Sequence, residues 1–549
     1  MNTSIESLES RIAPASLLNV SLSKGVLSIT GSTSSLDVDN LRLDLAKVGS
    51  DALLRIANTG GNLRFGGDVM EELELTKSEM SSLKSISIDL GAGANSAVFT
   101  IDTGTSLNAP IAYRGGIGAD TLTFGSDTKS FTTPKDFTAS LGGGNDRVIF
   151  THDSRFDGNT TLDLGAGDDS VLTETASPNT SPALSFKNLT VLGGDGNDSL
   201  ALGLQSDNNR DLNISGALTV DAGKGANDVS LFGNNVLIGT TTLESKARDK
   251  DFDVSISAAQ RLAASGSISV ATSGAEPGQT NEFRLEAPSI LISGRVVYTG
   301  GAGADAVAVG TESSSVQTII SGSVSVNNGD GNNSTAIGQS NAALAVGATI
   351  SVTGGNQADN LTVLAASGAV NSGVGATLGK GANAVSIRSD GQFNVGKLGL
   401  SSRSSAAEAD SLSLRGVVLN GYLNATLGEG NSTVDIAQVT ALGFFTLRTG
   451  AGNDIVQIDS DGRAGASTFF RPVILSLGDG ADKLQIGGDS ARDEAVFMNN
   501  LSVYVGRSDA LDEVMGFKLG GLGNRDNARA ALLAQNTFLG RTAPLLSRG

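Results

Sequence analysis

Apolar and polar residues alternate in short runs along most of the chain, and each run follows a Gly-rich turn. In the clearest copy, residues 193–198 read Gly-Gly-Asp-Gly-Asn-Asp, and Leu200 and Leu202 lie two and four places after the last Asp. Successive side chains of a strand point to opposite faces, so this spacing predicts a strand with one buried face. We call the last Asp or Asn of each such turn the slot.

The slot recurs about every 26 residues. Lys250 and Ser432 replace the usual Asp or Asn, and Gln357 and Glu408 replace the glycine before two other slots, yet the apolar pair after those two slots survives. A fixed period in this range is the signature of a solenoid. The slots that we assign are residues 95, 120, 146, 169, 198, 227, 250, 281, 305, 333, 359, 383, 410, 432, 454 and 482.

Each period holds three short strand-like stretches. Around Asp198 these are residues 189–192, 200–202 and 212–214. Three strands and three turns in one period form one coil of a parallel β-helix, and successive coils stack about 4.8 Å apart. We therefore predict an all-β, right-handed parallel β-helix with roughly 16 or more coils, its handedness following the general rule for parallel crossovers.

The two ends of the chain depart from the period. We divide the chain into an N-terminal segment (1–16), irregular N-terminal coils and cap (17–84), the repetitive β-helix (85–500) and a C-terminal cap and tail (501–549). Residues 69–83 fit a short helix or a decorated coil, and residues 527–538 fit a short amphipathic helix. End caps are expected because a terminal coil otherwise exposes an apolar face and unpaired strand edges.

Composition and charge narrow the class of protein. The hydrophobic content of 39% with 4% aromatic residues and no Trp predicts a core of Val, Ile, Leu and Ala. The net charge of −19 argues against nucleic acid as a partner and favours cations. Cysteine is absent, which excludes a disulfide framework and a thiolate metal site. No run reaches the roughly 18 apolar residues of a membrane-spanning helix.

The slot carboxylates are the main candidates for chemistry. Asp120, Asp146, Asp169 and Asp198 occupy four consecutive slots. Two carboxylates about 4.8 Å apart repel by roughly 1 kcal/mol in water, so such a row needs splayed side chains or cations between them. The alternative is that Asp and Asn satisfy backbone groups of the turns. The candidate ligands for Ca²⁺ or another hard cation are Asp120, Asp146, Asp168, Asp169, Asp195, Asp198, Asp305, Asp454 and Asp482.

Two stretches resemble known families. The turn at 193–198 resembles the Gly-Gly-x-Gly-x-Asp unit of the calcium-binding RTX repeats of secreted bacterial proteins, in which consecutive turns share each Ca²⁺. Here the unit appears once per period and never in tandem, so the RTX β-roll and its ligand geometry do not carry over as a whole. Residues 8–15, Leu-Glu-Ser-Arg-Ile-Ala-Pro-Ala, resemble a short N-terminal tag of large repeat-rich bacterial surface proteins.

These features favour an extracellular, structural or adhesive β-solenoid of the bacterial surface, with Ca²⁺ as a candidate stabilising ion. Its expected partners are cell-surface or matrix polymers, or further copies of itself, with no nucleic acid and no membrane span. The alternatives are a calcium-binding RTX-like secreted protein and a β-helix polysaccharide lyase or hydrolase resembling pectate lyases. The only His, His152, lies near Asp153 and Asp157 and fits a surface position, and no nucleophile, phosphate-loop or His-metal motif occurs. We therefore predict no catalytic residues.

Overall fold

The computed structural model describes most of the chain between residues 16 and 519. The gaps within this range are 35–36, 50, 127, 152, 175–182, 205–209, 247–250, 273–277, 461–464, 488–494, 506–512 and 516–517. The predicted N-terminal tag, His152, Lys250 and the helix expected at 527–538 therefore lie outside the described residues. The chain divides into two compact units, residues 1–223 and 224–549, which we call unit 1 and unit 2.

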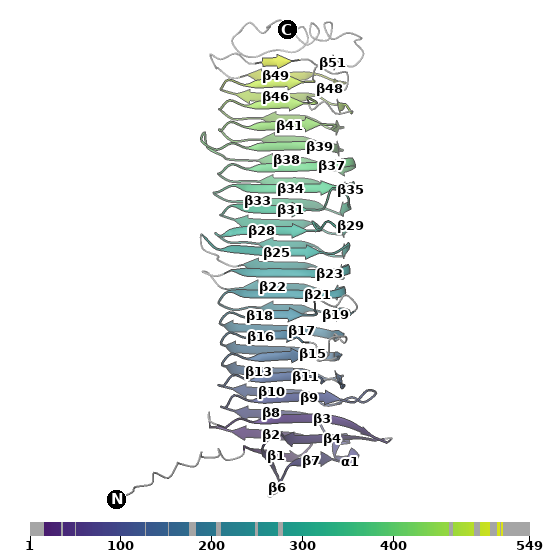
Figure 1. Ribbon diagram of the computed structural model, residues 1–549. Helices are drawn as coiled ribbons and strands as arrows, with labels where there is room; N and C mark the ends of the chain where they lie inside the picture. Colours follow the sequence, from purple (N-terminus) through teal and green to yellow (C-terminus); the bar gives the residue numbers. More distant parts are fainter. Residues whose placement is uncertain are drawn as a thin grey trace, which may run out of the picture. The chain divides into compact units, whose positions relative to one another are not determined.

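Both units are built from the same kind of coil. The chain is 63% strand with almost no helix, and it forms a parallel β-solenoid of about 15 turns with about 26 residues per turn. Within each unit, successive coils stack directly on one another (Figure 1). The predicted all-β parallel β-helix and its period are confirmed.

Unit 1 holds twenty strands and one short helix among its described residues. In chain order they are β1 (Leu17–Ser23), β2 (Val26–Ser32), β3 (Asn40–Val48), β4 (Asp51–Asn58), β5 (Asn62–Phe65), β6 (Asp68–Met70), β7 (Glu72–Leu75), α1 (Lys77–Ser81), β8 (Ser85–Gly91), β9 (Ser96–Ile101), β10 (Ile111–Gly116), β11 (Thr121–Phe124), β12 (Phe131–Thr133), β13 (Phe137–Gly143), β14 (Arg147–Phe150), β15 (Ser154–Ala166), β16 (Ser170–Thr173), β17 (Leu184–Asp195), β18 (Ser199–Leu202), β19 (Leu212–Ile214) and β20 (Leu218–Asp221).

The described part of unit 2 consists of strands and their turns. In chain order the strands are β21 (Asn227–Ile238), β22 (Thr241–Ser245), β23 (Phe252–Ala264), β24 (Ile268–Thr272), β25 (Thr280–Glu286), β26 (Ser289–Ile292), β27 (Val296–Thr299), β28 (Ala304–Val309), β29 (Gln317–Ile320), β30 (Val324–Gly329), β31 (Asn333–Ile337), β32 (Ala343–Val346), β33 (Thr349–Gly354), β34 (Asp359–Ala365), β35 (Ser367–Val370), β36 (Gly373–Thr377), β37 (Ala384–Val395), β38 (Leu398–Ser401), β39 (Ser411–Leu419), β40 (Leu423–Thr426), β41 (Thr433–Ala437), β42 (Thr440–Ala441), β43 (Phe445–Arg448), β44 (Ile455–Ile458), β45 (Ser467–Phe469), β46 (Val473–Gly478), β47 (Lys483–Ile486), β48 (Ala495–Phe497), β49 (Leu501–Val505), β50 (Glu513–Met515) and β51 (Lys518–Leu519).

The N-terminal part of unit 1 differs from the coils that follow. Strand β1 pairs antiparallel with β2, β3 pairs antiparallel with β4, and β4 pairs antiparallel with β7. Helix α1 follows β7 and begins with a capping box between Thr76 and Glu79. Strands β8 and β9 then pair in parallel with β2 and β3, which places the antiparallel hairpins at the start of the solenoid, where an end cap was expected. The helix lies within the predicted stretch 69–83.

The apolar pair after each slot forms the inner columns of the coils. Leu122 is level with Val148, and Phe124 is level with Phe150, in the parallel pair β11–β14. All four side chains are fully buried, and the rings of Phe124 and Phe150 stack with centroids 5.2 Å apart. Unit 1 therefore contains a stack of phenylalanines, which corrects the expected core of only Val, Ile, Leu and Ala. Its buried members are Phe99, Phe124, Phe131, Phe137, Phe150, Phe156 and Phe186.

The register corrects one slot of the predicted series. In the pair β21–β23, Asn227 is level with Phe252 rather than with Lys250. The repeat signal is weak here because the sequence of residues 246–251 is rich in charged residues and lacks glycine. Phe252 is buried at the slot position, so one coil of unit 2 has an aromatic side chain where its neighbours have Asp or Asn.

Candidate functional site

The slot side chains point into the coils. Every slot residue that the structure describes is buried, with no more than 6% of its surface exposed. Polar groups buried in this way need hydrogen-bond partners, because their water shell is lost. The buried set comprises Asn95, Asp120, Asp146, Asp169, Asp198, Asn227, Asn281, Asp305, Asn333, Asp359, Asn383, Asp410, Ser432, Asp454 and Asp482.

In unit 1 the slots form a ladder that links one coil to the next. The backbone N–H of Asn95 donates to Oδ1 of Asp120 at 2.7 Å, and that of Asp120 donates to Oδ1 of Asp146 at 2.6 Å. The series continues from Asp146 to Asp169 at 2.7 Å and from Asp169 to Asp198 at 3.0 Å. Each of these carboxyl groups therefore accepts a hydrogen bond from a backbone group of the preceding coil. We call this series the inner ladder.

Asp39 is a member of the inner ladder that the glycine pattern did not reveal. Its backbone N–H donates to Oδ1 of Asn95 at 3.0 Å, and its side chain is fully buried. No Gly-rich turn precedes it, but Leu41 and Leu43 stand two and four places later and are both buried. The apolar pair was the signal that could have identified this slot.

In unit 2 the inner ladder alternates between amides and carboxylates over six coils. The Nδ2 group of Asn281 donates to Oδ1 of Asp305 at 2.8 Å, and the backbone N–H of Asp305 donates to Oδ1 of Asn333 at 2.9 Å. The same two contacts recur between Asn333 and Asp359 at 2.8 Å and between Asp359 and Asn383 at 2.9 Å. The backbone N–H of Asn383 then donates to Oδ1 of Asp410 at 3.1 Å. Each Asn thus supplies a donor that no Asp can supply while ionised.

Glycines five places before several slots leave room for the second carboxylate oxygen. A Cβ atom on Gly115 would lie 2.3 Å from Oδ2 of Asp120 and 2.6 Å from the carbonyl oxygen of Leu141. A Cβ atom on Gly300 would likewise lie 1.8 Å from Oδ2 of Asp305 and 2.8 Å from the carbonyl oxygen of Asn328. These glycines therefore admit the carboxyl group into a space that already holds a carbonyl oxygen.

Several of these second oxygens are buried without a hydrogen-bond partner. They include the Oδ2 atoms of Asp120, Asp146 and Asp169 in unit 1 and of Asp305 and Asp359 in unit 2. A buried, ionised carboxylate with an unsatisfied oxygen is costly, whereas a protonated one carries no net charge. The geometry therefore favours the neutral acid at these positions.

The acidities agree with this geometry. Burial raises the pKa of Asp120 to about 6 and that of Asp146 to about 7. For Asp146, burial is the largest cause; the hydrogen bond from the Asp120 backbone opposes it, and the carboxylates of Asp169 and Asp120 add to the rise. In unit 2, burial raises the pKa of Asp305 and that of Asp359 to about 6, against the lowering effect of the Asn donors.

The structure divides the nine predicted cation ligands into two sets. Asp168 and Asp195 are exposed on the outside of their turns, and Oδ1 of Asp168 accepts the backbone N–H of Asn197 at 2.8 Å. The other seven belong to the buried slot series. Among the described residues, no group of three or more His, Cys, Asp or Glu side chains is placed to hold a metal ion. Calcium binding stays a prediction from the sequence.

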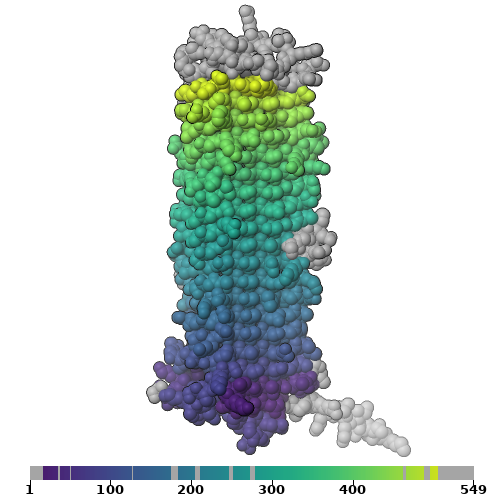
Figure 2. Space-filling model, turned by 180° about the vertical axis from the view of Figure 1, so that it is seen from behind, coloured from purple at the N-terminus to yellow at the C-terminus, as the bar shows by residue number. Residues whose placement is uncertain are grey.

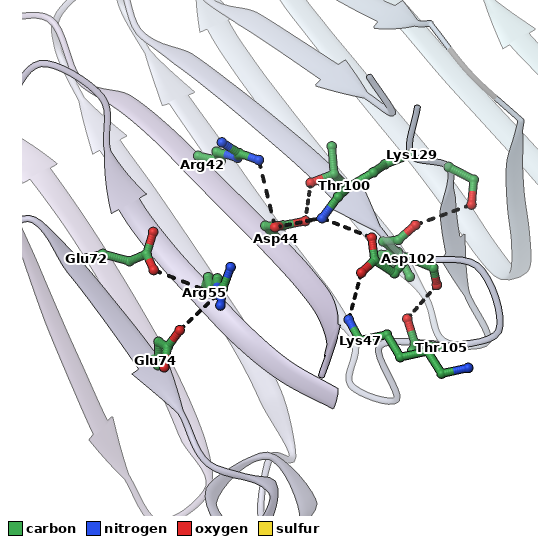
Figure 3. A network of polar contacts seen from close by, with 12 residues as sticks. Arg42, Asp44, Lys47, Arg55, Glu72, Glu74, Thr100, Asp102, Thr105 and Lys129 are labelled. Atoms are coloured by element: carbon green, nitrogen blue, oxygen red, sulfur yellow. Dashed lines mark hydrogen bonds and ion pairs between the residues drawn. The ribbon is translucent and has the colours of Figure 1, made fainter. Parts of the chain in front are cut away.

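A second polar cluster lies near the N-terminal hairpins of unit 1 (Figure 3). The Nζ atom of Lys129 lies 2.8 Å from Oδ1 of Asp44 and 2.9 Å from Oδ1 of Asp102. Thr100 Oγ1 donates to Asp44 at 2.7 Å, and the backbone N–H of Lys47 donates to Asp102 at 2.7 Å. Burial lowers the pKa of Lys129, but its bonds to both carboxylates outweigh this and raise it.

This cluster joins parts of unit 1 that are far apart in sequence. Asp44 lies on β3, Thr100 on β9 and Lys129 on the loop before β12, so the ammonium group holds a hairpin strand to the first regular coils. The charges occur at irregular spacing outside the repeat, and no sequence pattern singled them out. Their arrangement is that of an ion-pair clamp on the cap.

Comparison with known proteins gave no relative. No protein-family model, curated protein or solved structure matches the chain. Among the described residues, no helix is long and apolar enough to cross a membrane, and α1 has only five residues.

Proposed function

We propose that the chain is a structural and adhesive β-solenoid of the bacterial surface or extracellular space. The inner ladder is the observation that supports the structural role. In most coils it uses one buried polar side chain to hold the neighbouring coil in register. The stability of a repeat protein is approximately the sum of the intrinsic stability of each repeat and the contacts between neighbouring repeats. A chain that makes such contacts in nearly every coil is suited to presenting a long, regular surface.

The acidic surface and the resemblance of residues 8–15 to a surface-protein tag support the location. A net charge of −19 keeps such a chain soluble and favours cationic or polar partners outside the cell. Cell-surface polymers, matrix polymers and further copies of the chain are the partners that fit this role.

Two features support a structural role over cleavage of polysaccharides. The buried aspartates are engaged in the ladder between coils, whereas a glycoside-cleaving pair must face a cleft that admits substrate. Within each unit, the face drawn in Figure 2 shows closely packed coils and no deep hollow. Incubating the purified chain with pectate, alginate and cellulose would reveal reducing ends or unsaturated products if the enzymatic alternative were correct.

The location is tested with antibodies raised against the purified chain. We expect them to label intact cells of the source organism to the same extent as permeabilised cells. Labelling that appears only after permeabilisation would overturn the proposed surface role. Calcium as a stabilising ion is tested separately, by comparing the thermal unfolding midpoint in Ca²⁺ and in chelator, since a ligand of the folded state raises that midpoint.

A further inference from the structure

The last coils of unit 2 carry exposed apolar side chains at one corner. We call the turns 420–422, 442–444, 470–472 and 498–500 the corner turns. The residues before them, Leu419, Ala441, Phe469 and Phe497, are level with one another. The residues after them, Leu423, Phe445, Val473 and Leu501, are level as well. The four corner turns therefore stack directly on one another.

Five large apolar side chains of the corner turns face solvent. Tyr422 is 48% exposed, Leu442 42%, Phe444 60%, Phe470 44% and Met498 56%. The backbone at this corner is fixed, since the carbonyl oxygen of Phe444 accepts the N–H of Leu423 at 2.8 Å and Met498 N–H donates to Phe469 at 2.9 Å. A rigid, contiguous row of exposed aromatic and aliphatic groups marks an interaction surface, unlike apolar residues scattered singly.

The same turn in the preceding coils of unit 2 shows that the turn itself does not require these residues. In the preceding coils, the residues level with Leu419, each just before the same turn, are Val395, Val370, Val346, Ile320, Ile292, Ala264 and Ile238. The corresponding turns, residues 239–240, 265–267, 293–295, 321–323, 347–348, 371–372 and 396–397, contain only Gly, Ala, Ser, Thr, Asn, Arg and Lys. Among the turns that the structure describes at this corner of unit 2, large apolar residues therefore occur only in the four corner turns.

The corner is also basic in a strongly acidic chain. The turns and the strands after them, residues 395–401, 417–426, 439–448, 469–476 and 495–505, contain Lys397, Arg448 and Arg471 but no Asp or Glu, although the chain has 57 acidic residues. Lys397 lies over the Tyr422 ring, with Nζ 5.9 Å from the ring centroid. We call this surface, with its three cations and five apolar side chains, the basic corner.

We propose that the basic corner is a docking surface for the acidic surface of a second copy of this chain. Exposed aromatic residues, Met and Arg without carboxylates are the composition of a protein–protein interface core, and Leu442 and Met498 favour a protein over a sugar polymer. The charge of −19 makes another copy a complementary partner.

Unit 1 provides an acidic and partly apolar surface that matches the basic corner. Asp168 and Asp195 are exposed at the outside of its Gly-rich turns, and the side chains of Ile117 and Leu192 are exposed in the same unit. A contact between two different surfaces is heterologous, so it adds copies in series. This inference rests on the proposed structural role and gives it a mode of assembly.

The test is sedimentation velocity of the full chain over a range of concentrations at low and high salt. We expect reversible association that weakens at high salt, because screening reduces the attraction between the surfaces. The triple variant Tyr422→Ser, Phe444→Ser, Phe470→Ser should associate at least tenfold more weakly. The matched control Thr240→Ser with Arg295→Ser changes the same turn in earlier coils and should associate like the unchanged chain. Circular dichroism confirms that each variant is folded.

Charge reversal identifies the partner surface. We expect the double variant Lys397→Glu with Arg471→Glu to abolish association between copies. The double variant Asp168→Lys with Asp195→Lys should do the same. A protein carrying all four changes should associate again. A monomeric unchanged chain, or association that survives the triple variant, overturns the proposal. A monomeric chain that binds immobilised heparin through the basic corner also overturns it, in favour of an anionic polymer. None of these results affects the antibody labelling, so the proposed surface role is judged independently.

Discussion

The inner ladders of the two units solve the same problem with different side chains. Unit 1 places Asp120, Asp146, Asp169 and Asp198 in four consecutive slots, so each inner carboxylate has another carboxylate in a neighbouring coil. Unit 2 alternates Asn and Asp from residue 281 to residue 410, so Asp305 and Asp359 each have an amide in both neighbouring coils. The backbone hydrogen bonds have similar lengths in both ladders.

The two ladders surround their buried acids differently. Burial raises the pKa of Asp146 to about 7, and the carboxylates of Asp169 and Asp120 add to the rise. Burial raises the pKa of Asp305 to about 6, and the amide of Asn281 opposes the rise. An Asn donor stabilises the ionised form of its partner, and a like charge destabilises it. A row of buried aspartates can therefore replace an Asp–Asn alternation only if some of its members stay protonated.

Removing an acceptor from the unit 1 ladder should have the largest effect. Asp146→Ala leaves the buried N–H of Asp120 without its acceptor and opens a space in the turn, which should lower the free energy of unfolding by about 2–4 kcal/mol. Denaturant unfolding measures the loss, and hydrogen exchange should show faster exchange at the Asp120 amide. Unchanged exchange there would contradict the coil-to-coil role of the Asp146 carboxyl group.

Adding a carboxylate to unit 2 should break its alternation. Asn333→Asp creates three consecutive aspartates and removes the amide that donates to Asp359 at 2.8 Å. We expect a loss of about 1–3 kcal/mol at pH 8 and a smaller loss at pH 5, where the new carboxyl group is protonated. Equal losses at both pH values would show that shape, and not charge, decides which residue fits the slot.

Adding an amide to unit 1 should create the alternation there. The pKa of Asp146 is raised by folding, from an unfolded value of about 3.9 to about 7. Its contribution to stability is therefore fully present below about pH 4 and is lost as the pH rises through about 7. Asp146→Asn removes this loss, so we expect it to stabilise the protein by about 1–2 kcal/mol at pH 8 and by little at pH 4.

The same substitution in the unit 2 ladder serves as the control for Asp146→Asn. Asp305→Asn in unit 2 replaces a carboxyl group whose pKa rises only to about 6, so its gain at pH 8 should be smaller. If Asp146→Asn lowered stability at pH 8, the Asp146 carboxyl group would have a favourable partner in its ionised form, such as a bound cation.

The sequence revealed the parts of this molecule that repeat. The slot and its apolar pair recur at one period, so the coil, the buried columns and the row of Asp and Asn could be predicted. The direction of the hydrogen bonds could not, because the acceptor of Asp120 N–H lies in the next coil, at Asp146. Register was missed where the glycines are absent, as at Asp39 and Phe252.

Features that break the repeat were harder to predict. The Lys129 clamp joins residues from separate loops and strands, with no fixed spacing between them. The basic corner involves only four turns, and its apolar residues resemble ordinary strand residues until the register places them at an exposed corner. Sequence periodicity therefore identifies the repeated coils, whereas the features that depart from the repeat become visible only in the structure.

The smallest effect should come from a carboxylate on the outside of the same turns. Asp168 is adjacent to Asp169 in sequence, yet it is exposed, and it also accepts a backbone N–H from the next coil. Asp168→Asn keeps the accepting oxygen, so we expect the free energy of unfolding to change by less than about 0.5 kcal/mol at pH 5 and pH 8. A shift as large and as pH-dependent as that of Asp146→Asn would mean that the total number of carboxylates controls stability. A small shift that appears only in Ca²⁺ would instead place a cation on the outer face, where Asp168 and Asp195 are accessible.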